Sequence, residues 1–64
     1  MNPDELERRS TALFGKNWQT EFARHSGVDA RTVRRWKAGD REIPAWVNAL
    51  LHAWETLRLL GKDW

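Results

Sequence analysis

The sequence predicts an all-α fold, a compact domain of four short helices. Residues that suit the beginning of a helix alternate along the chain with glycines that suit its end. Apolar residues between them recur three and four positions apart, which is the spacing of a helix that buries one face. We found no repeat, linker or low-complexity tract, so residues 1–64 are interpreted as one domain. A chain this short buries only about 60% of its unfolded surface, which favours a second subunit.

The first helix is expected to begin at Pro3. Asn2 can cap it, proline suits its first position, and Asp4 and Glu5 complement the positive end of the helix dipole. Gly15 can end it as a left-handed cap. Four residues at helical spacing form its inner face: Leu6, Ser10, Leu13 and Phe14.

The second and third helices follow at once. Asn17 is expected to cap a helix over residues 18–25, and Asp29 to cap a helix over residues 30–38 that ends at Gly39. The second helix points three side chains inward: Trp18, Phe22 and Ala23.

Residues 18–38 have the spacing that two tightly crossed helices require. A small residue, Ala23, stands on the second helix where the third helix passes close, and Gly27 permits the positive φ that reverses the chain in a short turn. Val33 and Trp36 define the inner face of the third helix, since each residue advances by roughly 100°. The segment therefore predicts a helix-turn-helix motif.

The fourth helix is expected over about residues 44–60, opened by Pro44. Its predicted inner seam consists of Ile43, Val47, Leu50, Trp54 and Leu57. Apolar positions span roughly 200° of the wheel, about twice what one core contact needs, with Leu51 at the edge of the seam. We interpret the remaining apolar residues as a homodimer interface: Trp46, Ala49, Ala53, Leu60 and Trp64.

Positive charge is concentrated in the motif. The chain carries a formal net charge of only +2, but residues 16–41 hold seven lysines or arginines against Glu21, Asp29 and Asp40. This distribution is typical of a protein with a polyanionic partner, and double-stranded DNA is the partner that the motif predicts.

The segment resembles the Cro/C1-type (Xre-like) helix-turn-helix repressors of bacteria and phages. The matching residues are Gln19, Ala23, Gly27, Val28, Thr32, Val33, Trp36 and Gly39, followed by the turn Arg41-Glu42-Ile43-Pro44. The resemblance implies a lambda-repressor-like fold and a repressor that binds an inverted-repeat operator as a homodimer. It further implies a phosphate contact from Gln19 and control of the protein's own operon in a phage or mobile element, with an anti-defence operon as one such setting.

The predicted DNA contacts divide into two groups. The outer face of the third helix is expected to read the bases, because an arginine guanidinium can form bidentate hydrogen bonds with guanine O6 and N7. The predicted base-reading residues are Arg31, Arg34, Arg35 and Thr32. Asp29-Ala30 stands at the helix start in place of the small polar residue or glutamine of many relatives, which shifts the expected readout toward guanine. The phosphate contacts are expected from Lys16, Asn17, Gln19, Thr20, Lys37 and Arg41.

The alternative is that the protein is an antitoxin-like subunit that binds a protein partner through its last helix. An enzyme is not expected, since the two histidines are far apart and no nucleophile, phosphate-loop or metal-ligand pattern is present. No cofactor is expected. The sequence lacks cysteine, a long apolar run and a secretory leader pattern, so we expect a cytoplasmic protein with no membrane partner.

Overall fold

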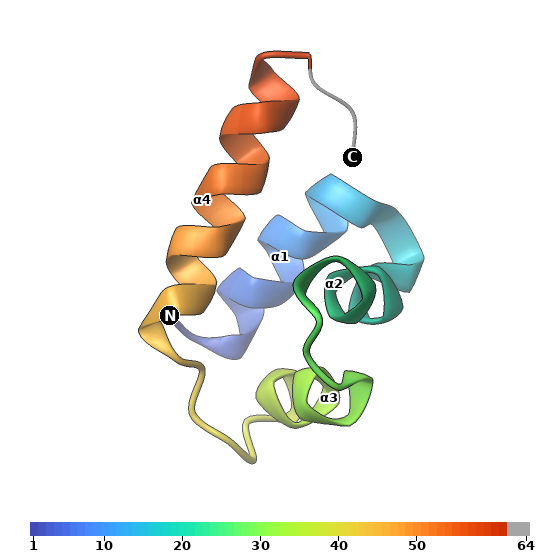
Figure 1. Ribbon diagram of the computed structural model, residues 1–64. Helices are drawn as coiled ribbons and strands as arrows, with labels where there is room; N and C mark the ends of the chain where they lie inside the picture. Colours follow the sequence, from blue (N-terminus) through green and yellow to red (C-terminus); the bar gives the residue numbers. More distant parts are fainter. Residues whose placement is uncertain (62–64) are drawn as a thin grey trace.

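Four α-helices and one short 3-10 turn make up the computed structural model, which describes residues 1–61 (Figure 1). The elements are, in chain order, α1 (Pro3–Phe14), the 3-10 turn η1 (Gly15–Asn17), α2 (Trp18–Ser26), α3 (Ala30–Ala38) and α4 (Ala45–Leu59). The described part of the chain contains no β-strand. The all-helical prediction is confirmed.

Most helix ends lie where the capping residues predict them. The Asn2 side chain accepts a hydrogen bond of 2.8 Å from the backbone N–H of Glu5, and Asp29 accepts one of 3.0 Å from Arg31. Both bonds satisfy a backbone donor that the first helical turn leaves unpaired. Gly39 ends α3 in the left-handed conformation, with φ 82° and ψ 6°. The predicted bounds of α3 are therefore correct at both ends.

The connection between α1 and α2 differs from the prediction. Asn17 does not cap α2 with its side chain, because η1 joins the two helices without a loop and holds Asn17 at φ −92° and ψ 29°. A capping side chain needs an extended backbone at that position. Gly15 has the expected positive φ of 84°, but its ψ of −154° lies outside the left-handed helical region.

The core forms around α1, which contacts α2, α3 and α4. Aromatic rings link the other helices: Trp54 of α4 meets Phe22 of α2 edge-on with ring centroids 5.1 Å apart, and Phe22 meets Trp36 of α3 at 5.9 Å. Within residues 1–61, ten apolar side chains are buried: Leu6, Leu13, Trp18, Phe22, Val33, Trp36, Ile43, Val47, Leu51 and Trp54.

The buried face of α4 is rotated relative to the predicted seam. Leu51, placed at the edge of that seam by the sequence, is fully buried, whereas Leu57 is 40% exposed and Leu50 is only partly buried. Leu57 lies roughly 90° around the helix from the middle of the buried face. The Arg58 guanidinium donates a hydrogen bond to the carbonyl oxygen of Leu13. The Arg58 side of α4 therefore faces α1, and Leu57 lies away from the core.

Candidate nucleic-acid interface

Three arginines on one side of α3 form the candidate site. Arg31, Arg34 and Arg35 are all exposed, while Val33 and Trp36 on the other side of the same helix are buried. No hydrogen bond or ion pair joins the three guanidinium groups to another residue within 1–61. The chain thus presents three positive charges from one rigid helix with nothing in the described structure to neutralise them.

The flanks of α3 are less open than its outer face. Lys37 is exposed, but its Nζ lies 4.0 Å from Glu7 Oε2 on α1. Thr32 is half-buried on the opposite flank. Lys37, which the sequence assigned to a phosphate contact, and Thr32, which it assigned to base readout, therefore border the arginine face. Both roles stay predictions.

The other predicted phosphate contacts fall into two places. Lys16 and Asn17 in η1 and Thr20 in α2 are exposed, and Gln19 beside them is half-buried. Arg41 is exposed in the loop after α3. In Figure 1, η1 and the start of α2 lie on one side of α3, and the loop of residues 39–44 lies on the other. This arrangement would suit a ligand that runs past both sides of α3.

A short turn and a ring contact hold α3 in place. Gly27, with φ 79° and ψ 6°, ends α2 in the left-handed conformation, and its N–H donates to the carbonyl oxygen of Ala23 at 2.9 Å. Ser26, which the sequence reading did not single out, accepts a bond of 3.2 Å from Val28 N–H and stabilises the same turn. Trp36 then anchors the helix against Phe22.

Trp46, expected at a homodimer interface, has an internal partner as well. Its ring lies 5.7 Å from the ring of Trp36 in an edge-to-face arrangement, and the residue stays 47% exposed. Three others of the predicted interface, Ala49, Ala53 and Leu60, are exposed. Trp64 lies outside the described residues.

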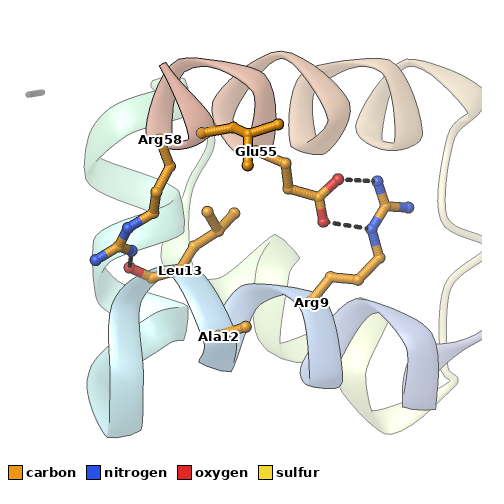
Figure 2. A pocket seen from close by; sticks show the side chains of 6 residues that line it. Arg9, Ala12, Leu13, Glu55 and Arg58 are labelled. Carbon is orange, nitrogen blue, oxygen red and sulfur yellow. Dashed lines mark hydrogen bonds and ion pairs between the residues drawn. The ribbon is translucent and has the colours of Figure 1, made fainter. Parts of the chain in front are cut away.

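A polar clasp between α1 and α4 is the feature that the sequence reading missed. Arg9 donates from Nε and Nη2 to the two carboxylate oxygens of Glu55 at 2.9 and 2.8 Å, a two-armed ion pair that Figure 2 shows. Its Nη1 donates to Glu5 at 3.1 Å and to Asn48 at 2.7 Å. Only the Arg9–Glu5 pair, four residues apart on one helix, was visible as a pattern in the sequence.

The clasp shifts the ionisation of both partners. The hydrogen bond from Arg9 holds the pKa of the Glu55 carboxyl below its usual value, against the opposing effect of partial burial. The same bond raises the pKa of Arg9. Beside the clasp, α1 and α4 border an open groove of about 380 Å³ (Figure 2), lined by Arg9, Ala12, Leu13, Glu55, Arg58 and Leu59.

The described residues contain no group of three or more histidine, cysteine or acidic side chains that could hold a metal ion. Among residues 1–61, no helix combines the length and the apolar character needed to cross a bilayer. Comparison of the chain with protein-family models, curated proteins and solved structures gave no match.

Proposed function

We propose that the protein is a sequence-specific double-stranded DNA-binding repressor in which α2 and α3 form a helix-turn-helix. The observation that carries the proposal is the outer face of α3. Arg31, Arg34 and Arg35 project from a helix whose opposite face is fixed in the core by Val33 and Trp36. Charged side chains held by a rigid helix are pre-organised for recognition, because their backbone loses little freedom on binding.

The dimensions of α3 suit the major groove. The helix has nine residues, so it is about 13 Å long, and its diameter of roughly 10–12 Å matches a groove about 12 Å wide. Each arginine can bond guanine O6 and N7 with both arms of its guanidinium, the commonest specific contact in this groove. We therefore assign base readout to Arg31, Arg34 and Arg35, with Thr32 at the border.

Phosphate contacts would come from the residues on either side of α3. Gln19 and Thr20 lie in the first turn of α2, where free backbone N–H groups and the helix dipole favour an anion. Lys16 and Asn17 precede them, and Arg41 would contact the DNA backbone on the other side of α3. Lys37 would exchange its distant partner Glu7 for a phosphate.

The regulatory output follows from the small size of the domain. A homodimer on an inverted repeat would block polymerase at the promoter of its own operon, as in the Cro/C1-type repressors of phages and mobile elements that the sequence resembles. Two recognition helices enter successive turns of the groove when they are about 34 Å apart. The fraction of operators bound would then depend on the protein concentration.

Selection of bound duplexes from a random pool tests the proposal. We expect a guanine-containing inverted repeat, bound by two chains as measured by light scattering. Arg34→Ala should lose preference at one base pair, whereas Arg8→Ala, which removes the same charge from an exposed position on α1, should keep the motif. No enriched motif, with only weak binding that salt abolishes, would overturn the proposal.

A partner-binding subunit of a toxin–antitoxin pair is the second candidate, supported by the exposed apolar residues at the end of α4. Leu57, Leu59 and Leu60 are exposed where a surface in contact with water ordinarily carries polar residues. Genomic context separates the two: a neighbouring toxin gene favours this candidate, and an inverted repeat upstream of the gene favours autoregulation.

A further inference from the structure

Asp29 stands at the start of α3, two residues before Arg31, and uses only one oxygen of its carboxylate within the described chain. Its Oδ1 accepts a hydrogen bond of 3.0 Å from the backbone N–H of Arg31. No hydrogen bond or ion pair within residues 1–61 reaches its Oδ2, and the residue is exposed. The cap therefore fixes the direction of the carboxylate and leaves one oxygen as an acceptor.

Capping alone does not require a negative charge at this position. Asparagine, aspartate and serine cap helices about equally well, and the charge adds only the modest attraction of the helix dipole. A carboxylate that served to balance the arginines of α3 would pair with them, but Arg31, Arg34 and Arg35 have no ion pair within the described part of the chain. Close to DNA phosphates a carboxylate is repelled, so Asp29 suits a bound duplex only where a base donates to it.

The major-groove chemistry of the four bases decides which base can donate. The N-terminal residues of a recognition helix contact base edges, and Asp29 lies at that end of α3. Cytosine presents the donor N4 amino group there, and acidic side chains accept from it. Guanine presents the acceptors O6 and N7, thymine the acceptor O4, and adenine the acceptor N7 beside its N6 donor. A carboxylate oxygen therefore favours cytosine over the other three bases.

We propose that Asp29 reads cytosine, with Oδ1 capping α3 while Oδ2 accepts a hydrogen bond from the cytosine N4 amino group. This inference rests on the proposed DNA-binding function and adds an acidic reader to the arginines. Arg31, two residues further along, would bond a guanine. Each half-site should therefore hold a cytosine close to the guanine that Arg31 contacts, whereas the arginines alone would select guanines.

The variant Asp29→Asn tests the cytosine contact and keeps the cap. Its amide oxygen can accept from the Arg31 N–H, and its NH₂ group then places a donor where Oδ2 offered an acceptor. Cytosine offers that donor no acceptor in the major groove. In selection from a random pool, we expect the wild type to show a cytosine position that Asp29→Asn loses. Titration of the matching duplexes should give the wild type a preference for cytosine on the order of tenfold, and the variant none.

Asp40→Asn is the matched control, because Asp40 is exposed in the loop just after α3. Each variant removes one negative charge near the proposed interface, so both should bind unrelated duplexes somewhat more tightly than the wild type. Only Asp29→Asn should bind the selected operator more weakly. Circular dichroism and thermal unfolding check that both variants keep the fold.

A modified base tests the named atom. N4-methylcytosine keeps the hydrogen that pairs with guanine and carries a methyl group in place of the N4 hydrogen that faces the major groove. The wild type should bind this operator about as weakly as one that lacks the cytosine, whereas Asp29→Asn should bind the modified and unmodified operators equally. Equal binding of the wild type to both would overturn the proposal. So would a cytosine position that Asp29→Asn keeps, or one that Asp40→Asn loses as well.

Failure of this proposal can be told apart from failure of the proposed function. A guanine-containing motif in which Asp29→Asn changes no position would reject the cytosine contact and keep the DNA-binding function, because Asp29 would then act only as a cap. No enriched motif for the wild type would reject both. Arg34→Ala leaves the Asp29 cap in place, so it should lose one guanine position and keep the cytosine.

Discussion

The clasp between α1 and α4 predicts a measurable coupling between Arg9 and Glu55. Exposed ion pairs contribute about 0.2–1 kcal/mol, and the side chains here are 17% and 38% exposed, with two parallel bonds of 2.8 and 2.9 Å. This two-armed geometry places the coupling near the upper end, at about 1 kcal/mol at pH 7. A double-mutant cycle with Arg9→Met and Glu55→Gln, followed by urea unfolding, measures it. The methionine keeps the apolar stem of Arg9 and removes its donors.

The pH dependence of the same coupling has a definite sign. The pKa of Glu55 is lower in the folded protein than its ordinary value of 4.5, so the stabilisation is present above about pH 4.5. It is lost as the pH falls through the folded pKa, because protonation removes the charge that Arg9 binds.

The exposed pair Glu21–Arg24, 3.5 Å apart on α2, is the matched control. Its side chains lie three residues apart on one helix, and we expect a coupling of at most about 0.3–0.5 kcal/mol there. A coupling between Arg9 and Glu55 no larger than this control at pH 7 would refute the reasoning. So would a coupling that persists unchanged at pH 3.

Four further changes test the site and the core. Arg34→Ala should weaken the binding free energy at the selected operator by about 1–3 kcal/mol and relax the sequence preference at one base pair, measured by titration of variant duplexes. Lys37→Ala should weaken all duplexes equally and lower the slope of log K against log salt by about one. Ser10→Ala should leave the free energy of unfolding unchanged or raise it by up to about 1 kcal/mol, because the buried Ser10 hydroxyl has no hydrogen-bond partner within residues 1–61. Leu51→Ala should lower that free energy by about 2–5 kcal/mol, whereas Leu57→Ala should cost under about 1 kcal/mol.

Each of these expectations can fail on its own. An unchanged base preference would remove Arg34 from the readers, and lost discrimination without a change in salt slope would contradict the phosphate role of Lys37. A clear loss of stability in Ser10→Ala would mean that its hydroxyl contributes to packing or bonding. Equal costs at Leu51 and Leu57 would contradict the rotation of α4 described above.

The sequence predicts the helix ends well where a side chain or a glycine determines them. Asn2, Asp29 and Gly39 act through bonds or φ angles that involve only a few neighbouring residues, so the pattern alone locates them. Asn17 fails as a cap because its backbone conformation depends on η1, a 3-10 turn that joins two helices without a loop. The residue types around Asn17 do not indicate that α1 and α2 are joined without a loop.

The orientation of α4 and its partner on α1 are harder to predict. Apolar residues cover about 200° of this helix, so several choices of inner face satisfy the pattern equally. The choice depends on contacts between residues far apart in the sequence, namely the Arg9–Glu55 clasp and the bond from Arg58 to Leu13. The arginine face of α3 was predictable because Val33 and Trp36 define one unambiguous inner side.

The central place of α1 has a consequence for how the chain unfolds. Its partner in the clasp, Glu55, lies 46 residues further along the sequence, and α2 and α3 pack on α1 as well. Opening any helix pair would therefore expose part of the same core, and no segment can detach with its own buried contacts intact. We expect the slowest amide protons of α1, α2 and α4 to exchange through one global opening with a common free energy. Because α3 packs on both α1 and α2, it would then keep its orientation until the entire domain melts.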